Sequence, residues 1–95
     1  MDKIYCVYIL ASKKNGALYI GITSNLKNRV WQHKNHAVDS HTSKYFIDKL
    51  VYYEQTENVL SAIEREKVLK KWKRQWKIDL FEKNNSEWKD LYETL

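Results

Sequence analysis

An Asn-Gly pair stands between two runs of β-forming residues in segment 7–21, VYILASKKNGALYIG. This pattern is the strongest short-range signal for a β-hairpin, because both central residues of a type I′ turn need positive φ, which Asn and Gly tolerate. We therefore expect two antiparallel strands joined by a two-residue loop at Asn15 and Gly16.

The two faces of this hairpin differ in character. Directly opposed residues share a face, and faces alternate along each strand. One face is wholly apolar and is expected to lie under helices: Val7, Ile9, Ala11, Leu18, Ile20 and Ile22. The other face is mixed, with Tyr8, Leu10, Ser12, Tyr19, Gly21 and Thr23. The expected register pairs Leu10 with Gly21 and Tyr8 with Thr23, and an odd-length loop would destroy the assignment of faces.

The rest of the chain predicts one more strand and several helices. A helix is expected from about residue 25 to residue 36, capped by Thr23 or Ser24. After a polar connection with a short helical turn, residues 50–54 (LVYYE) are typical of a strand. A further helix, capped by Thr56, continues or breaks near Trp72. The order β-β-α-β-α-α predicts an α+β fold, a small antiparallel sheet with helices packed on it.

The length and cysteine content limit the organisation of the chain. Ninety-five residues suffice for one modest core, so residues 1–95 are expected to form a single domain. The one cysteine, Cys6, excludes an internal disulfide. Neither a signal peptide nor a bilayer-spanning apolar run is found, so we expect no membrane partner and a cytoplasmic localisation.

The positive charge is concentrated in one segment. The chain has a formal net charge of +5, and residues 65–77 carry seven basic residues against one acidic residue. Basic residues interleaved with Trp72 and Trp76 suit nucleic acid, through phosphate contacts and base stacking. The alternative is a solvated lysine face with the tryptophans in the core, which we favour for the tryptophans alone. The candidate nucleic-acid-binding residues are Lys67, Lys70, Lys71, Lys73, Arg74 and Lys77.

Three polar side chains are candidates for chemistry. Arg29 and His33 are four residues apart, so they project from neighbouring turns on one side of the first helix, at the edge of its apolar stripe. Glu66 falls, in helical projection, inside the apolar arc formed by Val59, Ala62, Ile63 and Leu69. Such an inward carboxylate is either paired with Arg or Lys at the rim, or serves as a metal ligand or catalytic group.

Taken together, five pieces of the sequence resemble the GIY-YIG nuclease superfamily, and most closely its small single-domain bacterial branch. The first two pieces are Tyr8 in CVYIL and the triplet Tyr19-Ile20-Gly21 in LYIGIT; the other three are Arg29 in NRVWQH, His33 in the same stretch, and Glu66 in AIEREKVLKKW. The likeness extends from about residue 4 to residue 88. It implies a three-stranded antiparallel sheet flanked by helices and a metal-dependent hydrolysis of phosphodiester bonds.

The resemblance also implies a role for each residue. Tyr8 and Tyr19 would line the site, and one phenol, or a water that it orients, would act in proton transfer from the nucleophile. Arg29 would neutralise charge on the scissile phosphate, while His33 could shuttle a proton or hold the phosphate. Glu66 would hold a single divalent cation, Mg²⁺ or Mn²⁺. Gly21 would leave space for a phosphate to approach the strand backbone.

Three functions follow as hypotheses. The first is a metal-dependent endonuclease acting on DNA, on structured or single-stranded forms in repair or recombination, with DNA favoured over RNA. The second is a nucleic-acid-binding module of the same fold with weak or no catalysis, because the asparagine that many members carry beyond the glutamate has no match near Ile78. The third is a protein-interaction domain that uses Trp31 and the VYYE segment, although no obligate protein partner is inferred.

Overall fold

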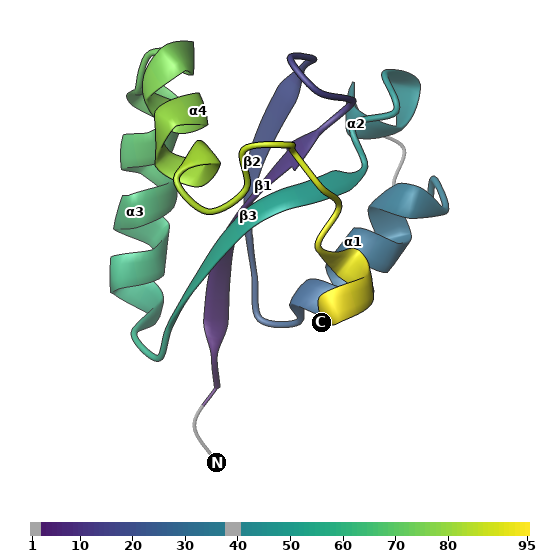
Figure 1. The fold of residues 1–95 in the computed structure, drawn as a ribbon. Helices are drawn as coiled ribbons and strands as arrows, with labels where there is room; N and C mark the ends of the chain where they lie inside the picture. The colour runs from purple at the N-terminus through teal and green to yellow at the C-terminus, as the bar shows by residue number, and fades with distance from the viewer. Residues whose placement is uncertain (1–2, 38–40) are drawn as a thin grey trace.

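The computed structural model describes residues 3–37 and 41–95. Its centre is a three-stranded antiparallel sheet in the order β2-β1-β3, formed by β1 (Tyr5–Ala11), β2 (Leu18–Thr23) and β3 (Lys49–Thr56). Helices cover both faces (Figure 1): α1 (Leu26–Lys34) and α2 (His41–Lys44) on one side, α3 (Val59–Lys71) and α4 (Arg74–Glu82) on the other. The predicted α+β fold with a three-stranded antiparallel sheet is confirmed.

The loop between β1 and β2 is longer than predicted. It spans residues 13–16, and the Gly16 N–H donates to the Lys13 carbonyl at 2.9 Å. Asn15 adopts a positive φ of 63°, whereas Gly16 does not. The predicted two-residue type I′ loop at Asn15 and Gly16 is therefore wrong, because that turn needs both residues at positive φ.

The longer loop shifts the hairpin register. Tyr8 lies opposite Gly21, and Leu10 lies opposite Tyr19, so the predicted pairings of Tyr8 with Thr23 and Leu10 with Gly21 are wrong. The shift is two residues. Since side chains alternate with a period of two, an even shift leaves every side chain on its predicted face.

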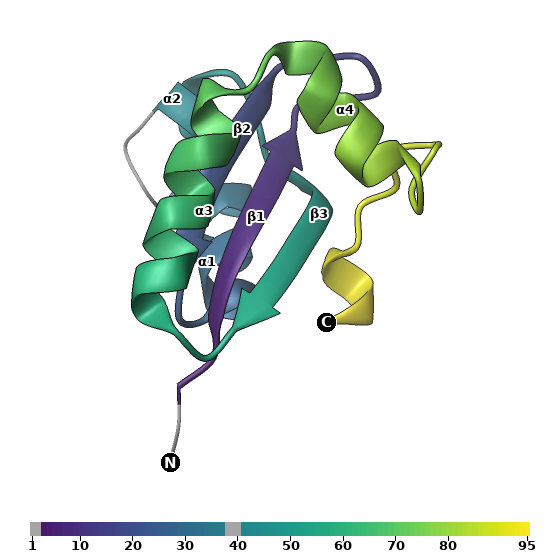
Figure 2. The ribbon, with the colours of Figure 1, turned by 90° about the vertical axis from the view of Figure 1, so that its left-hand side faces the viewer.

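The apolar face of the sheet forms one half of the core. Val7, Ile9, Ala11 and Ile20 are buried there, as predicted. They pack against buried side chains of α3, α4 and the segment beyond: Ala62, Leu69, Ile78, Phe81 and Trp88. Figure 2 shows α3 in front of β1 and β2, with α1 behind the sheet. This layer therefore holds α3 in place over the two strands that carry the candidate tyrosines.

Helices α1 and α3 start with the same local motif, a threonine followed two residues later by an asparagine. The Asn25 and Asn58 side-chain oxygens accept hydrogen bonds from the backbone N–H three residues further on and cap α1 and α3. The preceding Thr23 and Thr56 hydroxyls accept from the asparagine N–H groups at 3.0 and 3.1 Å. The predicted caps at Thr23, Ser24 and Thr56 are therefore wrong, because the asparagine takes that position.

The helices are short. The longest, α3, has 13 residues and ends at Lys71. Its C-cap, Trp72, has an extended ψ of 148°, so of the two alternatives that the sequence left open, the helix breaks here. The next helix, α4, begins at Arg74 after an extended Lys73. Within residues 3–37 and 41–95, no helix has the length and apolar character needed to span a membrane.

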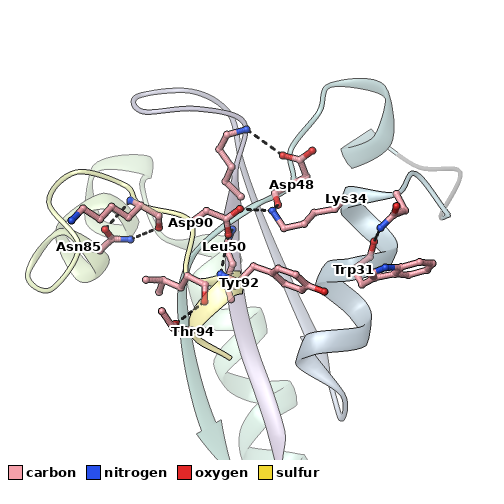
Figure 3. A network of polar contacts seen from close by, with 12 residues as sticks. Trp31, Lys34, Asp48, Leu50, Asn85, Asp90, Tyr92 and Thr94 are labelled. Atoms are coloured by element: carbon pink, nitrogen blue, oxygen red, sulfur yellow. Dashed lines mark hydrogen bonds and ion pairs between the residues drawn. The ribbon is translucent and has the colours of Figure 1, made fainter.

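The segment after α4 runs back along the outer edge of β3 and reaches α1 (Figure 3). The Leu91 N–H donates to the Leu50 carbonyl at 2.8 Å, and the Leu50 N–H donates to the Asp90 carboxylate at 3.1 Å. The same carboxylate pairs with Lys34 of α1, whose ammonium also donates to the Asp48 carbonyl at 3.0 Å. The segment thus ties β3 to α1 and ends in a 3-10 helix, Tyr92–Thr94.

Candidate active site

Tyr8 lies at the centre of the site, on the middle strand of the sheet. Its side chain is buried, and its hydroxyl is 3.3 Å from Nε2 of His33 on α1. The facing residue on β2 is Gly21. A Cβ at this position would overlap Cζ and the hydroxyl oxygen of Tyr8 and would lie 2.9 Å from its Cε1. The space that Gly21 leaves is therefore filled by the Tyr8 phenol, and the prediction that a phosphate enters this space is wrong.

Three aromatic rings meet at this point. The Tyr8 and Tyr19 ring centroids are 6.3 Å apart, and the His33 ring lies 6.1 Å from Tyr8 and 5.5 Å from Tyr19. Tyr8 and His33 are buried, whereas Tyr19 is partly exposed. Tyr19 is consequently the most exposed ring of this group.

His33 is held by two hydrogen bonds and kept neutral. Its Nδ1 is 2.9 Å from the Thr42 hydroxyl, and its Nε2 contacts Tyr8. Burial lowers the pKa of His33, the positive charge of Arg29 lowers it further, and Asp48 acts in the opposite direction. A neutral imidazole has one donor and one acceptor nitrogen. If Nδ1 donates to Thr42, Nε2 is left to accept the hydroxyl proton of Tyr8.

The charges of Arg29 and Glu66 both act on Tyr8. Burial raises the pKa of Tyr8, and interaction with Tyr19 raises it further. The Arg29 guanidinium lowers this pKa through its charge and a side-chain hydrogen bond, and the Glu66 carboxylate raises it. Arg29 comes from α1 and Glu66 from α3. The other four predicted chemical side chains, Tyr19, Arg29, His33 and Glu66, therefore all interact with the buried Tyr8 phenol, through contacts or charge.

Glu66 lies on the inward side of α3, as predicted. Only 18% of its side chain is exposed, and it stands between the buried Ala62 and Leu69, one turn to each side. The predicted arc is wrong in part, because Val59 and Ile63 are exposed. At the rim, the Glu66 carboxylate pairs with the Lys70 ammonium at 3.5 Å.

The donor set fits a hard divalent cation with a single protein ligand. Among residues 3–37 and 41–95, no group of three or more His, Cys, Asp or Glu side chains comes together as a metal cage. Mg²⁺ is commonly bound by one or two carboxylates, with water and substrate phosphates completing its octahedron. Glu66 would supply such a carboxylate, since its side chain is largely buried and its charge acts on Tyr8.

The sequence model of the GIY-YIG catalytic domain matches residues 4–79. The match covers most of the chain and includes Tyr8 and the four side chains that interact with it. The chain belongs to the GIY-YIG family. This confirms the resemblance inferred from the motifs and makes the protein a member of a family of nucleases.

Relatives of this GIY-YIG protein carry the name UPF0213. A UPF0213 protein of Clostridium perfringens is 40% identical over 74 residues, 78% of each chain. A UPF0213 protein of Autographa californica nuclear polyhedrosis virus is 59% identical over 34 residues, which are 36% of this chain and 32% of the viral protein. The solution NMR structure of a UPF0213 protein from Bacillus halodurans covers 92% of both chains with a TM-score of 0.56 at 23% identity, which shows a shared fold.

The basic residues of this GIY-YIG chain follow the C-terminal half of α3 and the start of α4. Lys67 and Lys71 are exposed. The other four make contacts within the protein. The Lys70 ammonium pairs with Glu66, the Lys73 ammonium lies 5.7 Å from the Trp76 ring centroid, and the Arg74 guanidinium donates to the Gly16 carbonyl at 2.6 Å. The Lys77 ammonium donates to the Lys70 carbonyl at 3.5 Å.

Two features of the GIY-YIG site were not predicted from the sequence. Thr42, which fixes the His33 ring, belongs to a polar connection that carries no motif. Trp76 is 51% exposed, whereas a core position was favoured for both tryptophans. That preference is wrong for Trp76 and holds for Trp72, which packs against the core. A helical projection started at Lys73, with Ile78 and Phe81 facing inward, would have placed Trp76 outside.

Proposed function

We propose that this protein is a metal-dependent endonuclease that hydrolyses phosphodiester bonds in DNA. The observation that carries the proposal is the convergence of two phenols, a guanidinium, a neutral imidazole and one largely buried carboxylate in a chain of a nuclease family. These are the groups that phosphodiester hydrolysis requires: a cation ligand, a counter-charge for the phosphate and a proton acceptor. We expect structured or single-stranded DNA as substrate.

Arg29 would neutralise the phosphate. Its side chain is partly buried, and its positive charge lowers the pKa of Tyr8, so it acts on the ring cluster. A guanidinium presents several N–H donors in a rigid plane that matches the oxygens of a phosphate. It would also stabilise the charge that develops in the transition state.

Tyr8 and His33 would move the proton. The Tyr8 phenol is protonated near neutral pH because burial raises its pKa, so it cannot serve as a ready-made base. Its hydroxyl can pass a proton to the neutral Nε2 of His33, 3.3 Å away, while it accepts one from the attacking water. Tyr19, the partly exposed phenol, would position that water or the phosphate at the entrance.

Glu66 would hold the cation, Mg²⁺ or Mn²⁺. When bound, such an ion polarises the phosphate and lowers the pKa of its water. The partner that Glu66 has at present, Lys70, is half-exposed, so exchange of this ion pair for a cation costs little. The exposed Lys67 and Lys71 would contact phosphates beside the scissile bond.

The test is cleavage of a labelled panel of single-stranded, duplex, gapped and branched DNA with Mg²⁺, Mn²⁺ or EDTA. Wild type and Tyr19→Phe are purified identically. We expect cutting by wild type that stops in EDTA and falls about a hundredfold or more in Tyr19→Phe. Equal activity in both proteins would identify a contaminating nuclease and overturn the proposal. A matched RNA panel decides between DNA and RNA.

The Glu66–Lys70 ion pair also favours a second candidate, a nucleic-acid-binding module without catalysis. In that case the carboxylate has a structural partner and needs no cation. The module would bind nucleic acid in a salt-dependent way, with no cutting in any metal. Glu66→Gln would leave this binding intact or strengthen it, because one negative charge is removed.

A further inference from the structure

An aromatic hollow opens on the outer side of α4. It has a volume of about 340 Å³ and is lined by Trp72, Trp76, Asp79, Leu80 and Lys83. The two indole rings meet at 80° with centroids 6.2 Å apart. Half of the Trp76 side chain is exposed, and such exposure of a large aromatic side chain on a small protein points to a binding surface.

Only part of the hollow is core packing. The buried residues of α4 are Ile78 and Phe81, and Trp72 and Leu80 pack against the same core cluster. By helical spacing, Trp76 projects from the side of α4 opposite to Ile78 and Phe81, and it is half-exposed. Trp72, at the end of α3, closes the hollow at one end, and the Arg65 guanidinium lies 5.3 Å from its ring centroid. The core therefore fixes the floor of the hollow and leaves the Trp76 ring free to contact a ligand.

The surroundings of the hollow are positively charged. The Lys73 ammonium lies 5.7 Å from the Trp76 ring centroid, and Lys83 is part of the wall. Asp79 is the acidic member of the lining, and its carboxylate accepts a hydrogen bond from the Gln75 amide at 2.8 Å. Exposed aromatic rings beside ammonium groups match a ligand with flat rings and negative charges, which is the chemistry of a nucleic acid strand with unpaired bases.

We propose that the Trp72–Trp76 hollow stacks an unpaired base of a single-stranded segment, while Lys73 and Lys83 contact the flanking phosphates. The inference rests on the proposed function and specifies its substrate class. Trp72 follows Glu66 by six residues, about 9 Å along a helix. A base stacked in the hollow would therefore lie within a few nucleotides of a phosphate at Glu66, and fully paired DNA would lack the base that the hollow holds.

The test measures binding apart from cleavage. The fluorescence anisotropy of a labelled oligothymidylate and of a labelled blunt duplex is followed in EDTA, where no metal-dependent cutting interferes. The proteins are wild type, Trp76→Ala, Trp76→Phe and the control Trp31→Ala. Trp31 is also an exposed tryptophan, but it lies on α1, on the other side of the sheet.

We expect Trp76→Ala to weaken binding of the oligothymidylate about tenfold, with little change for the duplex. Trp76→Phe should restore most of the affinity, and Trp31→Ala should bind as wild type does. Stacking should also quench tryptophan fluorescence in wild type, and the quenching should decrease in Trp76→Phe. Because Trp76 is half-exposed, its replacement should leave the thermal unfolding midpoint nearly unchanged.

Several results would overturn the inference. Unchanged oligothymidylate binding by Trp76→Ala would remove the stacking role, and the nuclease proposal would survive if metal-dependent cutting persists. Equal losses for the oligothymidylate and the duplex would indicate a general electrostatic surface. A change in sedimentation on Trp76→Ala, without a change in nucleic acid binding, would assign the hollow to a second copy of the chain. If wild type binds no nucleic acid at all, the inference and the proposed function fail together.

Discussion

Alternate residues of β1 point to opposite faces of the sheet and have different roles there. On one face of β1, Val7 and Ile9 belong to a wholly apolar layer with α3 and α4. On the other face, Tyr8 belongs to a second buried cluster, with Leu10 and Val30, and also contacts the buried His33, which Thr42 holds. The apolar layer depends on close packing, whereas the polar layer depends on hydrogen bonds, because a buried polar group without a partner is costly.

The buried polar side chains all have hydrogen-bond partners in the part of the chain that the structure describes. Within these residues, every buried side-chain nitrogen or oxygen has a hydrogen-bond partner. The interactions are specific: His33 is held at both ring nitrogens. The comparison teaches that both faces bury apolar side chains, whereas the hydrogen-bonded phenol and imidazole lie on one face alone. Mutations on the two sides should therefore separate stability from activity.

The largest effect is expected in the apolar layer. Leu69 of α3 is fully buried in that layer, and truncation leaves a cavity. Leu69→Ala should lower the free energy of unfolding by about 3 kcal/mol. Urea denaturation followed by circular dichroism measures this loss. Cleavage per folded molecule should stay close to wild type, and a selective loss of cleavage would contradict the separation of the two layers.

In the polar layer, Arg29 should show the reverse pattern. Arg29→Met removes the counter-charge for the phosphate and should reduce the cleavage rate about a hundredfold or more. The free energy of unfolding should change by no more than about 1 kcal/mol, because the methionine keeps most of the stem packing. Lys27→Met, at an exposed position two residues earlier on α1, is the control. Similar losses in both variants would mean that only the total positive charge matters.

A substitution at Gly21 should affect both the stability of the fold and the cleavage rate. A methyl group at this position would overlap the Tyr8 phenol, and the phenol is buried and cannot move aside freely. Gly21→Ala should cost about 2 kcal/mol in unfolding free energy, as overpacking does, and should also slow cleavage because Tyr8 is displaced. In Gly16→Ala the new methyl meets the side chains of Ser12 and Lys13 in a surface loop, so the losses should be smaller. Full cleavage by a destabilised Gly21→Ala would argue against the Tyr8–His33 contact in catalysis.

The smallest effect is the dependence of stability on pH. The folded protein holds the pKa of His33 below the ordinary value of 6.5, so below that value the unfolded chain binds more protons than the folded protein. The His33 contribution is present above pH 6.5 and is lost as the pH falls from there through the folded pKa. Thermal unfolding midpoints of wild type should therefore fall more steeply than those of His33→Gln in this range. Parallel curves would mean that His33 has an ordinary pKa.

The side of the sheet or helix on which most candidate residues lie could be predicted, because it depends on the periodicity of side chains along strands and helices. The assignment of Tyr8 and Tyr19 to one face survived a wrong loop, since an even shift in register keeps the alternation. The inward position of Glu66 followed from helical spacing. The roles assigned to these residues stay predictions until cleavage is measured.

Other features could not be predicted, because they depend on contacts between distant segments. Lys34 and Asp90, which tie the C-terminal segment to α1, are 56 residues apart, and neither belongs to a motif. Thr42 comes within hydrogen-bond distance of His33 only once the chain has folded. The loop between β1 and β2 was misjudged because Asn15 alone takes the positive φ, a choice between two residues that both tolerate it.

The central claim is that the carboxylate of Glu66 serves a divalent cation at the polar cluster. The most direct measurement is the single-turnover cleavage rate as a function of Mg²⁺ concentration for wild type, Glu66→Gln and Glu64→Gln. Glu64 is an exposed acid on the same helix, two residues earlier, and serves as the matched control. We predict a saturable Mg²⁺ dependence for wild type and Glu64→Gln, and a loss of about a thousandfold or more for Glu66→Gln. Cleavage by Glu66→Gln at the wild-type rate, with the wild-type Mg²⁺ dependence, would contradict the account.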